Sequence, residues 1–281
     1  MEVRRHSFRA RDGLCLSALE WDGPAEHTPL LCLPGIARTA RDFAALARRQ
    51  HGMRRVVALD YAGHGDSERP NRVARYSVRE AIRDVLDAMA ALHLHRVALL
   101  GTSFGGILSM LLGVLRPAAL AAVALNDIGP RLEPTGLDSV RDLIGHDPAF
   151  ASREEAIAFL KQRLPLLDIA EADWPAMAER TYARGEDGRW HPRWDPRIVQ
   201  AMAVKDAAPD NLWPAFGALA HVPLLLIWGQ ESALLSAETV RAMRGARPDM
   251  QLVSLPGIGH APLLDHPATI AGLDRFLAAV P

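Results

Sequence analysis

Short apolar segments alternate with helix-forming segments along most of this 281-residue chain, and this alternation constrains its fold more than any other feature. Residues 56–61, 97–101 and 120–125 are short apolar runs of the kind that form buried strands. Residues 77–92 carry apolar side chains at helical spacing instead. Parallel strands need crossover connections, which are usually helices. We therefore predict an α/β fold with a mainly parallel sheet that helices cover on both faces.

The alternation stops near residue 130 and resumes near residue 222. The stretch between contains helical patterns at residues 154–164 and 174–184, several prolines and four of the six tryptophans, namely Trp174, Trp190, Trp194 and Trp213. It is too long and too apolar to be a simple loop. We predict that residues 1–130 and 221–281 form the core domain and that residues 131–220 form a helical insertion.

The charge of the chain argues against two classes of partner. It carries 32 basic and 33 acidic residues, a formal net charge of −1, and no block of like charge. Nucleic-acid and membrane surfaces usually need clustered basic residues, so we expect neither partner. The apolar runs are too short to span a bilayer, and no signal-peptide pattern follows the N-terminus. We therefore expect a cytoplasmic protein, and the sequence does not indicate its oligomeric state.

The strongest local signal is G-T-S-F-G-G at residues 101–106, where an apolar strand meets a helix. It matches the nucleophile elbow, G-x-S-x-G, in which a strained turn exposes a serine hydroxyl at the carboxyl end of a strand. Ser103 is therefore the candidate nucleophile. Gly101 and Gly105 leave space where a Cβ would meet the neighbouring strand and helix. The alternative is a glycine-rich turn that only packs tightly or binds a phosphate.

An activated serine needs a base, and with this motif the order along the chain is serine, acid, histidine. His260 lies just after the last predicted strand, residues 252–255, in a loop bracketed by glycines and prolines. The chain has 11 histidines, and this position after the last strand distinguishes His260 from the others. We therefore select His260 as the base, against the alternative of a solvated loop histidine.

Together these features resemble an α/β-hydrolase of the lid-bearing esterase, lactonase and carbon–carbon hydrolase type, along essentially the whole chain. Residues 60–67, D-Y-A-G-H-G-D-S, are similar to the family's turn D-x-x-G-x-G-x-S. That turn is structural in the family, so His64 is not the expected base. The resemblance implies an α/β-hydrolase fold, with a mostly parallel eight-stranded sheet and an inserted helical lid over the site.

Residues 33–36, L-P-G-I, align with the family's H-G-x motif, in which the residue after the glycine donates an N–H to the oxyanion. The resemblance therefore implies that the backbone N–H groups of Ile36 and Phe104 form the oxyanion hole. Pro34 is a departure, because it occupies the position of the family's histidine. Ile36 nevertheless keeps its own N–H.

The acid of a catalytic triad is harder to assign. Relatives place an aspartate shortly after the strand predicted at residues 224–228, but Ser232 and Ala233 stand there. Asp127 follows the preceding strand at the same edge of the sheet and is our first candidate, against a role as a structural cap or lid anchor. Glu231 is the alternative acid, since its longer side chain offsets its shifted position. The third possibility is that no acid works, with Ala233 either native or an introduced replacement.

These residues predict a serine hydrolase that cleaves a small carboxylic ester or lactone through an acyl-enzyme on Ser103, with His260 as base. A carbon–carbon bond hydrolase of a vinylogous diketone, using the same two residues, is the alternative enzyme. A non-catalytic small-molecule-binding protein on a hydrolase scaffold is the alternative of another class. No metalloprotease, P-loop or dinucleotide-binding motif is present, so we expect no cofactor and no metal.

The predicted lid also bears on the substrate. Its leucines and tryptophans indicate an apolar ceiling over the site, although Trp174 fits the lid's own core. Arg189, Arg193 and Arg197 are candidates for pairing with a substrate carboxylate, and we favour a solvated face for them.

Overall fold

The computed structural model describes residues 2–202 and 211–281. An eight-stranded sheet runs through it in the order β1-β2-β4-β3-β5-β6-β9-β10. The strands are β1 (Val3–Arg9), β2 (Cys15–Trp21), β3 (Leu30–Leu33), β4 (Val56–Asp60), β5 (Val97–Thr102), β6 (Leu120–Asn126), β9 (Leu224–Gly229) and β10 (Gln251–Leu255). The pairings of β2 with β1 and β4 are antiparallel, and the other pairings are parallel. The predicted mostly parallel eight-stranded sheet is therefore confirmed.

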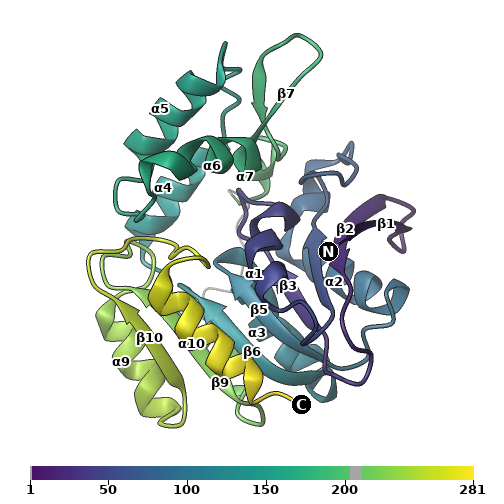
Figure 1. Ribbon diagram of the computed structural model, residues 1–281, viewed down its shortest axis with the longest axis vertical. Helices are drawn as coiled ribbons and strands as arrows, with labels where there is room; N and C mark the ends of the chain where they lie inside the picture. Colours follow the sequence, from purple (N-terminus) through teal and green to yellow (C-terminus); the bar gives the residue numbers. More distant parts are fainter. Residues whose placement is uncertain (1, 203–210) are drawn as a thin grey trace.

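Helices cover both faces of this sheet, as the alternating pattern predicts (Figure 1). One face packs against α2 (Val78–Ala91), α3 (Phe104–Leu115), α8 (Trp213–Gly217) and α9 (Ala237–Ala246). The other face packs against α1 (Ala44–Arg49) and α10 (Pro267–Ala278). Short 3₁₀ helices lie at Ala40–Phe43, Val73–Tyr76, Pro117–Ala119 and Glu171–Asp173. Because both faces are buried, the central strands are apolar except at the carboxyl ends of β5 and β6, which carry Thr102 and Asn126.

The segment between β6 and β9 forms a separate cluster beyond one end of the strands, at the top of Figure 1. It contains α4 (Pro134–Ile144), α5 (Arg153–Arg163), α6 (Trp174–Thr181) and α7 (Ile198–Met202). Its own apolar core includes the buried Trp174 and Trp194. Although α8 belongs to residues 131–220 by position, it packs on α3 in the main core.

The insertion is not wholly helical, which corrects one expectation. The helix predicted to continue to residue 184 ends at Thr181, and an antiparallel pair follows, β7 (Tyr182–Arg184) and β8 (Trp190–Pro192). The turn between them contains Asp187-Gly188, with Gly188 at φ +79°. An Asp-Gly pair between short strands is a hairpin signal, because glycine adopts positive φ without strain. Within the described residues, no helix combines the length and the apolar content that crossing a bilayer requires.

Candidate active site

Ser103 lies at the sharp turn between β5 and α3, as the elbow motif predicts. Its backbone is at φ 50° and ψ −114°, a strained conformation for a residue with a side chain. The turn is tight because glycine lets the helix approach the sheet. A Cβ on Gly105 would lie 2.0 Å from the carbonyl oxygen of Leu33, and one on Gly101 would lie 2.5 Å from the carbonyl oxygen of Gly105. The Ser103 N–H donates to the carbonyl oxygen of Asn126 at 3.0 Å, which ties the turn to β6.

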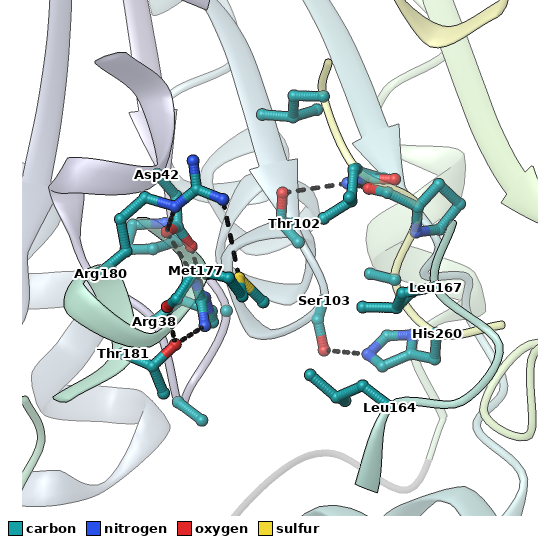
Figure 2. Close-up of a pocket in the computed structure, with 18 of the residues that line it drawn as sticks. Arg38, Asp42, Thr102, Ser103, Leu164, Leu167, Met177, Arg180, Thr181 and His260 are labelled. Carbon is teal, nitrogen blue, oxygen red and sulfur yellow. Dashed lines mark hydrogen bonds and ion pairs between the residues drawn. The ribbon is translucent and has the colours of Figure 1, made fainter. Parts of the chain in front are cut away.

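The structure brings His260 to this serine. The loop after β10 places His260 Nε2 2.9 Å from Ser103 Oγ, within hydrogen-bonding distance, as Figure 2 shows. The other ring nitrogen, Nδ1, lies 2.7 Å from Asp127 Oδ2. With the proton on Nδ1, the imidazole donates to the carboxylate and accepts from the serine hydroxyl. That is the arrangement of a Ser-His-Asp triad.

Asp127 reaches the imidazole because β6 and β9 are neighbours in the sheet. It directly follows β6, and its own N–H donates to the carbonyl oxygen of Ile227 in β9 at 2.8 Å. Its side chain is completely buried, and its Oδ1 accepts from the Gly229 N–H at 2.9 Å. The carboxylate is thus held by one fixed backbone donor on one side and by His260 on the other. Such hydrogen bonding orients an acid as well as stabilising its charge.

Glu231, the alternative acid, makes no hydrogen bond to His260 within the described residues, although both line a second pocket. It is exposed, and its backbone N–H donates to the carbonyl oxygen of Ile258. At the neighbouring position, the Ser232 hydroxyl accepts from the N–H groups of Leu234 and Leu235, both at 3.2 Å, and so stabilises a local turn. Of the two candidate carboxylates, Asp127 is therefore the one that contacts the imidazole. Its catalytic role stays a prediction.

The predicted oxyanion donors lie beside the serine. Phe104 is the first residue of α3, where backbone N–H groups have no partner inside the helix. Within residues 2–202 and 211–281, neither the Phe104 N–H nor the Ile36 N–H donates a hydrogen bond. The loop around Ile36 is held from behind, since Tyr61 Oη donates to the carbonyl oxygen of Pro34 at 3.1 Å. The His64 ring also contacts the carbonyl oxygen of Ile36, with Nε2 at 2.6 Å.

The turn after β4, which the family motif marks as structural, supports the same loop. The Asp60 carboxylate accepts from the backbone N–H groups of Ala40, at 2.8 Å, and Asp66, at 3.2 Å. Burial raises the pKa of Asp60 to about 6. Asp60 and His64 therefore position backbone around the site, and neither contacts Ser103.

A cavity of about 160 Å³ opens at Ser103 and His260. Its walls are mainly apolar, and many come from the insertion, including Val140, Leu143, Leu160, Leu164, Leu167, Met177 and Trp194. The leucines of the expected apolar ceiling thus line the cavity. Trp194 is the tryptophan that contributes, whereas Trp174 lies in the insertion's own core.

Charged residues that the sequence reading did not select also line this cavity. They include Arg38 and Asp42, which follow the oxyanion loop, and Arg180 on α6. The three arginines that the sequence offered as carboxylate partners do not line the cavity. They donate hydrogen bonds elsewhere: Arg189 to the carbonyl oxygen of Ala149, Arg193 to the carbonyl oxygen of Glu179, and Arg197 to the Asp195 carboxylate. Arg38 precedes the 3₁₀ helix that begins at Ala40, so its spacing from Asp42 was not a helical ion-pair signal. The contact of Asp42 with Arg180 joins distant parts of the chain and has no sequence signal either.

Within the described ranges, no group of three or more His, Cys, Asp or Glu side chains is arranged to hold a metal ion.

Comparison with known proteins agrees with this fold. Residues 30–273 match the model of the alpha/beta hydrolase family, and the chain belongs to that family. It is 32% identical to a 3-hydroxybutyrate-oligomer hydrolase of Cupriavidus necator, over 92% of this chain and 90% of that protein. It is 28% identical to a 2-hydroxymuconate semialdehyde hydrolase of Pseudomonas sp. strain CF600, over 80% of this chain and 77% of that protein. A crystal structure of an alpha/beta hydrolase from Novosphingobium aromaticivorans superposes with a TM-score of 0.94 at 37% identity, covering 99% of this chain and 98% of that one.

Proposed function

We propose that the protein is a serine hydrolase that cleaves a short carboxylic ester or lactone. The observation that carries this proposal is the continuous hydrogen-bonded series from Asp127 through His260 to Ser103 Oγ, which opens into an apolar cavity. Belonging to a hydrolase family supports the reaction class. The departure at the usual acid position does not oppose it, because Asp127 supplies a carboxylate from the neighbouring strand.

In the proposed reaction Ser103 Oγ attacks the ester carbonyl carbon while His260 Nε2 takes the hydroxyl proton. The N–H groups of Ile36 and Phe104 donate to the oxygen that becomes negative in the tetrahedral intermediate. His260 then gives its proton to the leaving alcohol, which leaves an acyl group on Ser103. Water, activated by His260, releases the acid and restores the serine. Asp127 holds the proton on Nδ1 and stabilises the imidazolium that forms.

An ester is favoured as the substrate by the 32% identical relative, which is named for oligomers of 3-hydroxybutyrate. Hydroxy acids joined into oligomers are linked by ester bonds. The leucine and methionine walls of the cavity suit a short aliphatic acyl or alcohol portion. We propose that the insertion serves as the lid that excludes water from this cavity.

Hydrolysis of p-nitrophenyl acetate and p-nitrophenyl butyrate tests the proposal, with the parent protein beside Ser103→Ala. The proposal expects turnover by the parent and only background release of nitrophenolate with the variant. Equal rates from the two proteins would refute a serine mechanism on esters. Ser109→Ala is the matched control, because its hydroxyl is buried in α3 and donates to the carbonyl oxygen of Gly105.

Hydrolysis of a carbon–carbon bond in a vinylogous diketone is the second candidate. The similarity to a 2-hydroxymuconate semialdehyde hydrolase favours it, and the same serine and histidine would serve. Cleavage of a dienone substrate without turnover of nitrophenyl esters would select this reaction. A ligand that raises Tm and is recovered unchanged would instead support a non-catalytic binding protein.

A further inference from the structure

Two arginines share a single carboxylate at one side of the cavity. Both oxygens of Asp42 accept from the Arg38 guanidinium, at 2.5 Å from Nε and 2.6 Å from Nη2. Arg38 Nη1 also donates to Thr181 Oγ1 at 2.5 Å, across to the insertion. A two-point pair of this kind is among the strong ion pairs in proteins. Arg38 and Asp42 therefore neutralise each other.

Arg180 has no comparable partner. Its Nε lies 3.7 Å from Asp42 Oδ1, beyond hydrogen-bonding distance, and this nitrogen is a buried donor without a partner in the described part of the chain. Its Nη2 contacts Met177 Sδ at 3.6 Å, and a thioether sulfur is a weak acceptor. The Arg180 guanidinium thus keeps a positive charge and several N–H donors that its described neighbours do not satisfy.

The Arg180 side chain is 28% exposed, so water reaches part of its guanidinium. Its Nε is nevertheless buried, next to the apolar Met177, and a buried charged donor gains stability when an opposite charge pairs with it. Two other ionisable groups line the cavity. His260 is engaged with Ser103 and Asp127, and Asp265 is exposed to solvent. A negatively charged ligand would supply the missing partner of Arg180.

We propose that Arg180 binds a free carboxylate of the substrate, so that the preferred substrates are short esters that retain one ionised carboxyl group. This inference rests on the proposed hydrolysis at Ser103. Figure 2 shows Arg38, Asp42 and Arg180 on one side of the cavity view and Ser103 with His260 on the other. A short hydroxyalkanoate ester would place its carbonyl at the serine and its carboxylate at the guanidinium, which offers the planar donor geometry that a carboxylate prefers.

Two versions of one substrate test this proposal. They are the linear dimer of 3-hydroxybutyrate as the free acid and as its terminal primary amide, with cleavage of the internal ester followed by chromatography. We expect kcat/KM of the parent to favour the acid by at least about tenfold, since a charged hydrogen bond is lost in the amide. Arg180→Met should lower kcat/KM for the acid by about 10- to 100-fold, mainly by raising KM, and change that for the amide by less than about threefold. Arg153→Met, an exposed arginine paired with Glu179, should change neither.

The outcomes separate the two proposals. If Arg180→Met lowers both activities equally, Arg180 only ties the insertion to Asp42, and the carboxylate proposal is overturned. If the parent cleaves neither compound, the proposed hydrolysis of such esters at Ser103 is refuted. The carboxylate proposal is then tested by measuring the affinity of Ser103→Ala for the acid and for the amide. Tighter binding of the acid than of the amide, lost in Ser103→Ala/Arg180→Met, then supports the carboxylate site. Equal affinities, or no binding of the acid, contradict it.

Discussion

Replacing Asp127 by asparagine tests the least expected member of the proposed triad. The carboxylate accepts two hydrogen bonds, from His260 Nδ1–H at 2.7 Å and from the Gly229 N–H at 2.9 Å. Asparagine has nearly the same shape but only one acceptor oxygen. Because the Gly229 N–H can only donate, the amide oxygen must face Gly229 and the NH₂ group must face His260. The Nδ1 atom then accepts, the proton moves to Nε2, and His260 no longer accepts the proton of Ser103.

The expected loss follows from that change of tautomer. The corresponding replacement in a serine protease lowers kcat by about 10⁴, which is about 5 kcal/mol of transition-state stabilisation. We expect a loss of the same order for Asp127→Asn, measured as nitrophenolate release from p-nitrophenyl butyrate, with Ser103→Ala as the floor. Glu231→Gln is the matched control and should stay within about twofold of the parent, because this carboxylate is exposed and makes no hydrogen bond to His260 in the described residues.

Two results would refute this reasoning. One is an Asp127→Asn protein that is folded, with an unchanged Tm, and that retains more than about a tenth of the parent kcat. The other is a Glu231→Gln protein that loses activity by about 10³ or more, which would make Glu231 the acid.

Two further predictions concern stability, both measured by urea denaturation. Because burial raises the pKa of Asp60 to about 6 from a usual 3.8, the folded protein holds this proton more tightly than the unfolded chain. This stabilisation is largest below about pH 4 and is lost as the pH rises through 6. The free energy of unfolding of the parent should therefore fall by about 2 kcal/mol relative to Asp60→Asn between pH 4 and 7. Parallel pH profiles for the two proteins would contradict the buried carboxyl. Gly105→Ala should cost about 3 kcal/mol or more because its Cβ meets the Leu33 carbonyl, whereas Gly245→Ala in α9, with nothing within 4 Å, should stabilise by roughly 0.5–1 kcal/mol. Equal stabilities of the two glycine variants would show that the elbow tolerates a side chain.

Those parts of the fold that depend on local pattern were predictable. The central strands and the helix at Val78–Ala91 follow from apolar periodicity, and the elbow at Ser103 follows from its glycines and its strand–helix context. The hairpin at residues 182–192 was missed because the helical pattern of α6 was extended to residue 184, over β7. The Asp187-Gly188 pair carried the contrary signal.

The site depends more on tertiary structure. The sequence left Asp127 and Glu231 as alternatives, because the choice rests on β6 lying beside β9 and on where the loop of His260 turns. Arg180 was not selected, since it meets Asp42 only through packing of the insertion over the core. Contacts between segments so distant along the chain leave no periodicity to read.

Covalent trapping of the nucleophile tests the central claim most directly. The protein is treated with diethyl p-nitrophenyl phosphate, which phosphorylates an activated serine and releases nitrophenolate, and the adduct is located by peptide mass spectrometry. Our account predicts one adduct on Ser103, none in Ser103→Ala, and labelling slowed by about 10² or more in His260→Ala, because the base is lost. An active esterase labelled at another residue, or labelled at Ser103 at the same rate without His260, would contradict it.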